Sequence, residues 1–175
     1  ERAQNNITEN TTLRHVRKDL PLPMHRESLE DYLASYKQCL AILKANNLDP
    51  EMDWSGAHVP STVKEAMFIP QGIVRRYEAQ QQADIYTVET HALRIGDTAL
   101  YSIPFELFCE FGFRIRARAR YDHVVGIQLA CGSDAYLPTK RAVDGKAYSA
   151  VAASNTIGPE GGTLLAAILG DTLND

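Results

Sequence analysis

The feature that most constrains the fold is a strand, a helix and a second strand that follow one another closely in the second half of the chain. Residues 98–103 (TALYSI) have the composition of a short strand, and residues 105–119 have helical periodicity. Residues 123–130 (HVVGIQLA) are apolar and β-branched, which predicts a strand buried on both faces. Two strands joined by a helix over so short a stretch form a βαβ unit, so they should run parallel with a right-handed crossover.

A further strand precedes this unit and extends its sheet. Residues 85–95 have a strand pattern, and Gly96-Asp97 supplies residues that favour a tight turn. The strand at 98–103 should therefore be the antiparallel hairpin partner of the strand at 85–95. Parallel and antiparallel pairs in one sheet predict the α/β class: a small mixed sheet with a βαβ unit, flanked by helices.

The first part of the chain is expected to contribute one strand and two helices. Residues 11–18 (TTLRHVRK) favour a strand, and Pro21 and Pro23 should close it off. From Ser28 to about Asn46 the apolar residues recur at helical spacing. This part of the chain therefore looks like scaffold.

The second of these helices should be irregular near its middle. Thr62 and Glu65 match a capping box, which predicts the helix start. Pro70 and Gly72 should kink or break the helix, which then resumes from about Ile73.

No repeat, low-complexity stretch or linker divides the chain. We therefore expect a single domain over residues 1–175, which is the size of one domain or of half of a larger catalytic domain. Residues 1–84 should be mainly helical scaffold, and residues 85–175 should hold the βαβ unit and the loops that carry the site. Pro159 suits the first turn of a closing helix that should run to about Leu173.

Charge and hydropathy exclude two classes of partner. The net charge of -4 gives no field for nucleic acid or for an anionic membrane, and no apolar run is long enough to span a bilayer. The alternate arginines from Arg114 to Arg120 lie near Glu106, Glu110 and Asp122, and are expected to form a solvated helix face. The N-terminal stretch lacks the basic end and the apolar centre of a signal peptide, so we expect no targeting signal in this chain.

Cysteines, histidines and serines show no pattern that assigns chemistry. The three cysteines lack metal-site spacing, and Cys39 and Cys109 lie in apolar helical contexts that predict burial. The five histidines show no H-x-H or H-x-x-x-H spacing, and His91 and His123 are expected to be polar surface or boundary residues. No serine lies in a G-x-S-x-G sequence, so no nucleophile can be assigned.

Two polar side chains follow the ends of the predicted parallel strands. Glu106 comes three residues after the first strand, and the loop after the second strand contains Asp134 and Tyr136. Residues just after parallel strands lie on one edge of the sheet, where open α/β folds place their ligands, and neighbouring strands are only about 4.8 Å apart. Glu106 is also expected in the first turn of its helix, where the dipole favours the ionised carboxylate, a suitable ligand for a hard or borderline cation.

Each of these residues also has an ordinary structural interpretation. A glutamate in the first turn of a helix is common because of the helix dipole alone. A tyrosine before Leu-Pro is often a packed ring with its hydroxyl at the surface. A non-catalytic α/β module that binds a partner or a small ligand is therefore a second hypothesis beside an active site.

Four stretches of the second half occur in an order that a known family shares. They are IPFELF, HVVGIQLACGSDAYLPT, AYS and IGPEGGTLLAAIL. In this order and spacing the chain resembles the C-terminal part of the catalytic domain of neutral/alkaline, non-lysosomal ceramidases and their bacterial relatives. In that family a strand ends in Pro-Gly-Glu before a helix, the next strand leads to a Gly-Tyr-Leu-Pro-Thr-like loop, and a further tyrosine precedes a Gly-Pro segment.

The resemblance implies a zinc-dependent hydrolase of N-acyl lipid amides. It assigns zinc ligands to Glu106 and Tyr136, and it assigns to Tyr148 the tyrosine that stabilises the oxyanion beside the metal. The family's two histidine ligands and its serine-bearing loop lie in an N-terminal half, which we expect to be the partner of this chain. The chain alone should be inactive and bind little Zn²⁺. The family is typically exported, which implies a secreted or periplasmic protein.

Three positions depart from the family pattern. Phe105 stands in place of the glycine of Pro-Gly-Glu, Ala135 precedes the tyrosine where a glycine is common, and Ser149 stands where a glutamate often follows the second tyrosine. These departures keep open a third hypothesis, a diverged and metal-independent hydrolase of the same family.

Overall fold

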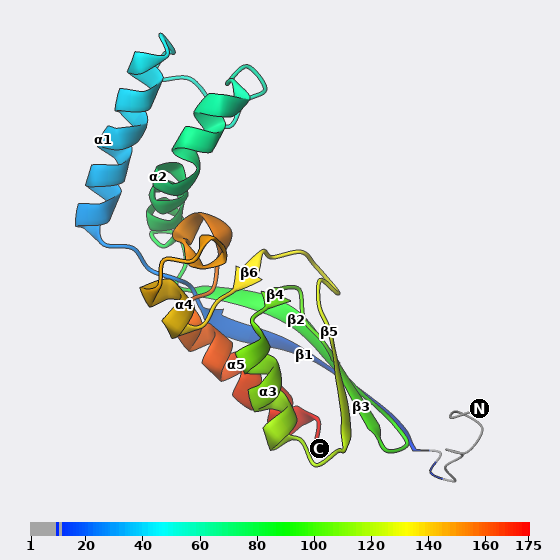
Figure 1. Ribbon diagram of the computed structural model, residues 1–175. Helices are drawn as coiled ribbons and strands as arrows, with labels where there is room; N and C mark the ends of the chain where they lie inside the picture. Colours follow the sequence, from blue (N-terminus) through cyan, green and yellow to red (C-terminus); the bar gives the residue numbers. More distant parts are fainter. Residues whose placement is uncertain (1–9, 11) are drawn as a thin grey trace.

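The main feature of the computed structural model, which describes residue 10 and residues 12–175, is a four-stranded sheet (Figure 1). The strand order is β1-β2-β3-β5. β1 pairs with β2 and β2 with β3 in antiparallel fashion, whereas β3 and β5 run parallel. The predicted small mixed sheet of the α/β class is therefore confirmed. Its strands are β1 (Leu13–Pro23), β2 (Ile85–Ile95), β3 (Thr98–Ser102) and β5 (His123–Ile127).

β2 and β3 form the hairpin that the sequence predicts. Gly96 and Asp97 join the two strands, and Ile95 lies opposite Thr98 in the pairing register. Gly96 has a φ of 57°, a left-handed conformation that glycine adopts without steric cost. The two turn residues thus let β3 fold back and pair with β2 in the predicted antiparallel arrangement.

β1 is longer than predicted and belongs to the main sheet. It pairs with β2 from Leu13 to Pro23, so the expectation that Pro21 and Pro23 close the strand off is wrong. β1 is an edge strand, and an edge strand tolerates prolines whose missing N–H would break a ladder in the middle of a sheet. Thr11, the first residue of the predicted strand, lies outside the described residues.

The βαβ unit is present, but its second strand is not buried on both faces. α3 (Cys109–Arg118) joins β3 to the parallel strand β5. β5 is an edge strand in which only Val124 is partly buried, and Val125 and Ile127 are exposed. The reason is that the long helices α3 and α5 lie on one face of the sheet (Figure 1). The composition of a strand does not determine which of its faces the helices cover.

The face of the sheet covered by helices holds the main hydrophobic core. α5 (Pro159–Thr172) packs against α3 and β1. Leu165 and Leu169 lie one turn apart on α5 and are fully buried together with Phe111 of α3. The helix start that the sequence places at Pro159 is confirmed.

α1 (Leu29–Ala45) and α2 (Ser61–Ala79) form a helical hairpin at one end of the sheet (Figure 1). Ser28 caps α1, because its side chain accepts a hydrogen bond from the Asp31 N–H. The hairpin has a small core of its own, formed by Cys39, Leu43, Val59, Val63 and Met67.

α2 departs from its predicted start. The proposed capping box of Thr62 and Glu65 is wrong, because the helix already begins at Ser61 after Pro60, with no side-chain cap. Thr62 therefore lies inside the first turn rather than before it.

α2 also continues through its predicted break. Pro70 lies within the helix, and helical structure extends across Gly72 without interruption. Gly72 has a packing role instead: a Cβ at this position would lie only 2.4 Å from the Cα of Ala153. The glycine lets α2 approach the short helix η3 (Ala152–Ser154), which leads out of the region that carries Tyr148.

A second, two-stranded sheet replaces the predicted first turn of the helix at 105–119. β4 (Glu106–Leu107) pairs in parallel with β6 (Tyr136–Leu137). Glu106 therefore lies in a strand, and the expectation that a helix dipole acts on it is wrong. The backbone N–H of Leu107 donates to the side chain of Gln128 at 2.8 Å, so this segment is bound to the loop after β5 before α3 begins.

Short helices complete the chain between β6 and α5. They are α4 (Lys140–Asp144) and the 3₁₀ helices η2 (Tyr148–Ala150) and η3. Within residue 10 and residues 12–175, no helix is both long and apolar enough to cross a membrane.

Candidate functional site

The loops that follow the two parallel strands meet, as the topology predicts. Glu106 in β4 lies directly opposite Tyr136 in β6 in the pairing register. The Glu106 N–H donates to the Ala135 carbonyl at 2.9 Å, and the Asp134 N–H donates to the Pro104 carbonyl at 2.8 Å. The backbone thus holds a carboxylate and a phenol side by side at one rim of the sheet.

The side chains of this pair interact electrostatically. The pKa of the Tyr136 hydroxyl is raised, first by the negative charge of Glu106 and then by partial burial and by a hydrogen bond to Glu106. The nearby Tyr148 adds a smaller contribution of the same sign. The phenol therefore keeps its proton to higher pH than an isolated tyrosine does.

This coupling gives a direct prediction for the titration of Tyr136. Glu106→Gln removes the largest cause of the shift, so the pKa of Tyr136 should fall toward its ordinary value. The ultraviolet absorbance of phenolate, compared with a Tyr136→Phe reference for assignment, measures the change. Glu110→Gln is the matched control, and an unchanged titration in Glu106→Gln would show that the two side chains do not interact.

Tyr148 joins the pair from a separate element. Its ring lies 6.5 Å from the Tyr136 ring, centroid to centroid, in an edge-on arrangement at 74°. On its other side it stacks on Phe68 of α2, with 5.7 Å between ring centroids. The side chain is 69% exposed, so its position depends on these ring contacts. The three site residues Glu106, Tyr136 and Tyr148 are brought together, although they come from three elements.

A pocket lies on the α2 side of Tyr148. Its volume is about 730 Å³, within the range usual for small-molecule sites, and Tyr148 forms part of its wall. Phe68, Ile69 and Ile73 supply apolar surface, and Lys64 and Glu65 supply charge. The pocket offers space for an apolar group beside the tyrosine pair.

Ala135, one of the three departures named above, has a backbone conformation that favours glycine. Ala135 has a φ of 58°, in the left-handed region that glycine occupies at low cost. The backbone conformation at this position is thus one that a glycine suits better than the alanine that this chain carries.

Ala135→Gly should therefore stabilise the fold. The left-handed conformation costs an L residue roughly 1–2 kcal/mol, and the extra chain entropy of glycine offsets roughly 0.5–1 kcal/mol of the gain. We expect the free energy of unfolding to rise by up to about 1.5 kcal/mol in a urea titration. Ala119→Gly, at a position with a φ of -74°, is the control and should give no stabilisation. Loss of stability in Ala135→Gly would contradict the argument.

Asp134 has a structural partner in the main sheet. The Tyr86 hydroxyl of β2 donates to an Asp134 carboxylate oxygen at 2.9 Å. Burial and this hydrogen bond together raise the pKa of Tyr86. Asp134 thus anchors the loop to the main sheet, a role that the sequence pattern did not reveal.

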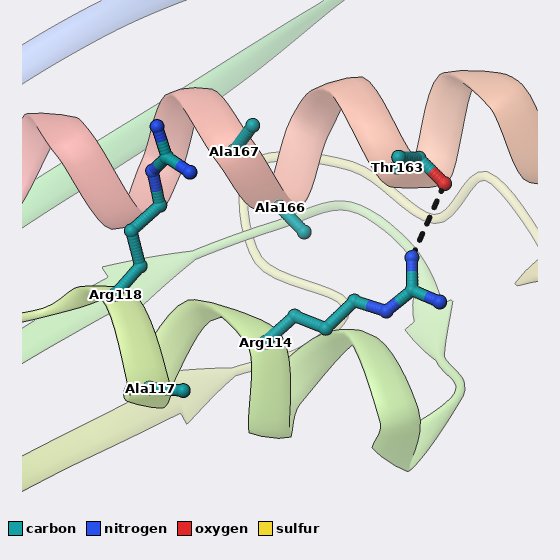
Figure 2. Close-up of a pocket in the computed structure, with 6 residues that line it drawn as sticks. All are labelled: Arg114, Ala117, Arg118, Thr163, Ala166 and Ala167. Carbon is teal, nitrogen blue, oxygen red and sulfur yellow. Dashed lines mark hydrogen bonds between the residues drawn. The ribbon is translucent and has the colours of Figure 1, made fainter.

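Arginines on α3 line a groove between α3 and α5 (Figure 2). Arg114 pairs with Glu110 one turn earlier, and it donates to the Thr163 hydroxyl at 3.4 Å. Arg118 makes two hydrogen bonds to Asp171, at 2.5 and 2.9 Å, which lower the pKa of that carboxyl. Both guanidinium groups already have carboxylate partners, as expected for a solvated helix face.

Sequence reasoning missed one further polar cluster. Glu89 and His91 of β2 lie beside Cys131, which is exposed, as is Cys109 against expectation. The available signal was weak: Glu89-x-His91 places two side chains on one face of a strand, but Cys131 comes from a distant loop.

Comparisons with known proteins assign the chain to no family. No family model, no curated protein and no solved structure matches the chain. The function has to be argued from the side chains and their geometry.

Proposed function

We propose that this chain is the C-terminal portion of a zinc-dependent amide hydrolase similar to the neutral ceramidases. The observation that carries the proposal is the pairing of Glu106 with Tyr136 on adjacent parallel strands, with Tyr148 beside them. The resemblance selects these three residues from the sequence alone. Their convergence from three separate elements supports a common site.

The donor set fits part of a zinc site. A carboxylate oxygen is a usual zinc ligand, and Tyr136 lies directly opposite Glu106 in the strand pair, close enough for the two charges to interact. Two oxygen donors fall short of the three or four protein ligands that zinc sites use. We propose that two histidines from a preceding segment of a longer protein complete the set, which makes that segment the partner of this chain.

The roles of the three residues follow from their positions. Glu106 and Tyr136 would hold the metal, and Zn²⁺, when bound, polarises an amide carbonyl and lowers the pKa of a bound water. Tyr148 is exposed and its ring lies beside Tyr136, so its hydroxyl is available to donate a hydrogen bond to the carbonyl oxygen as negative charge develops there. The apolar wall formed by Phe68, Ile69 and Ile73 can accept the acyl chain of a lipid amide.

Phe105 does not obstruct this arrangement. Phe105 lies in the bend before β4 and is fully buried in the main core, whereas the next residue, Glu106, is exposed. The bulky ring that stands where the family has a glycine thus packs into the core and not beside the exposed Glu106. This placement favours the zinc hydrolase over the metal-independent alternative.

The proposal is tested by metal removal from the longer protein that includes the preceding segment. A chelator should abolish hydrolysis of an N-acyl sphingoid amide, and Zn²⁺ should restore it. The isolated 175-residue chain should show no hydrolysis under either condition. Hydrolysis that survives complete zinc removal would support the metal-independent branch. A longer protein with neither zinc nor hydrolysis would support the non-catalytic binding module.

A further inference from the structure

A second group of metal-ligand side chains lies on the main sheet, outside the site described above. Glu89 and His91 are two residues apart on β2, so both side chains project from the same face. Cys131 reaches this face from the loop that follows β5. One ligand atom from each of the three residues lies within 4.8 Å of the other two.

A second histidine orients His91. The His91 Nδ1 and the His15 Nε2 are 2.7 Å apart, and the two rings stack with centroids 4.9 Å apart and an angle of 7°. The His91 Nε2 lies 3.0 Å from a Glu89 oxygen. When Nδ1–H donates to His15, the lone pair of Nε2 is free for a cation, and His15 takes the place of the outer-shell acceptor that a metal-bound histidine usually has.

The carboxylate of Glu89 is also held in place. Arg17 Nε donates to one carboxylate oxygen, Oε2, at 2.9 Å, and this leaves the other oxygen, Oε1, facing His91. The guanidinium of Arg17 thus lies on one side of the carboxylate, and His91 lies on the other. The ion pair with Arg17 fixes the position of a carboxylate, which is a usual zinc ligand.

Cys131 is the third donor. It has a φ of 63°, and its Sγ lies 4.0 Å from the Ser102 hydroxyl oxygen, which accepts a hydrogen bond from the His91 N–H. His91 and Cys131 line an open pocket of about 310 Å³, whose wall includes Leu100 and Ile127. The thiol is thus accessible and lies in a partly apolar setting beside the imidazole.

We propose that Glu89, His91 and Cys131 bind one Zn²⁺ ion on the face of the sheet that α3 and α5 leave open. A thiolate, an imidazole and a carboxylate together suit zinc, and a thiolate does not suit Mg²⁺ or Ca²⁺. Water takes the fourth position. The Cys131 thiol releases its proton to solvent when the ion binds. The site is independent of Glu106 and Tyr136.

Cobalt binding to the purified chain tests this site, because Co²⁺ occupies zinc sites and a cobalt–thiolate bond absorbs in the near ultraviolet. We expect one equivalent of Co²⁺ to give this charge-transfer absorption, and Zn²⁺ to displace it. Cys131→Ser should abolish the band, and His91→Ala should abolish it or weaken binding at least about 100-fold. His15→Ala should weaken binding by about 10- to 100-fold, as outer-shell partners do.

Two controls separate this site from other binding. Cys109→Ser removes the other exposed cysteine and should leave the band unchanged. The double variant Glu106→Gln/Tyr136→Phe should also leave it unchanged, so failure here is distinct from failure of the proposed hydrolase site. Absence of the band in the unaltered chain, its persistence in Cys131→Ser, or its loss in either control would overturn the proposal. Circular dichroism verifies that each variant is folded.

Discussion

Glu106→Gln is expected to abolish amide hydrolysis by the longer protein. The substitution keeps the shape of the side chain but removes the negative charge that faces Tyr136. Loss of an outer-shell partner already weakens metal binding by about 10- to 100-fold, so loss of a direct ligand should weaken it by more than about 100-fold. Hydrolysis of an N-acyl sphingoid amide at limiting Zn²⁺ should fall by at least the same factor.

A matched variant makes this result specific. Glu110→Gln makes the same chemical change four residues further along, at a glutamate that pairs with Arg114 on the surface of α3. An exposed i,i+4 ion pair contributes only a few tenths of a kcal/mol, so activity should stay unchanged. Full hydrolysis in Glu106→Gln would remove Glu106 from the site, and equal loss in both variants would indicate a general effect on folding.

Phe105→Ala is expected to lower the free energy of unfolding by about 3–5 kcal/mol, the usual cost of truncating a fully buried aromatic side chain. Phe105 has no exposed surface and belongs to the main core. The loss should be large enough to lower the midpoint of a urea titration clearly, since whole domains are stable by only about 5–15 kcal/mol. Denaturation followed by circular dichroism measures it.

Phe113→Ala is the control for this prediction. Phe113 lies on α3 and is 68% exposed, so its truncation should change stability by no more than about 0.5 kcal/mol. A small effect at Phe105, similar to that at Phe113, would mean that the Phe105 ring does not fill the core. The ring would then not be held in the core, away from the exposed Glu106.

Local patterns predicted the elements whose causes are themselves local. The turn residues Gly96 and Asp97 define the β2–β3 hairpin, and the proline at position 159 defines the start of α5. Chain connectivity also requires β3 and β5 to run parallel. Each of these features depends on turn chemistry, backbone constraints or handedness within a short stretch.

Three of the wrong predictions, at β5, Gly72 and Glu106, depend on contacts between segments that are distant in the sequence. β5 is apolar and β-branched, yet it is an exposed edge because the long helices α3 and α5 lie on one face of the sheet. Gly72 does not break α2, and its missing side chain makes room for Ala153, which is distant in the sequence. Glu106 lies in a strand because its backbone binds Ala135, which is distant in sequence.

The grouping of Glu106, Tyr136 and Tyr148 could be predicted only in part, because strand topology determines some of it and long-range packing determines the rest. Parallel strand ends bring Glu106 and Tyr136 to one rim, which follows from topology. Tyr148 was selected by resemblance, and its place depends on stacking against Phe68 of a helix far away in the chain. The cluster of Glu89, His91 and Cys131 was not predicted, because motif spacing along the chain does not identify residues that become neighbours only in the folded sheet.

Zinc content of the longer protein tests the central claim most directly: Glu106 and Tyr136 supply half of one metal site. The measurement should use a Cys131→Ser background, which removes the second proposed site. Elemental analysis is expected to find one equivalent of zinc in that background and almost none once Glu106→Gln and Tyr136→Phe are added. An unchanged zinc content after both substitutions, or no zinc in the background protein, would contradict the claim.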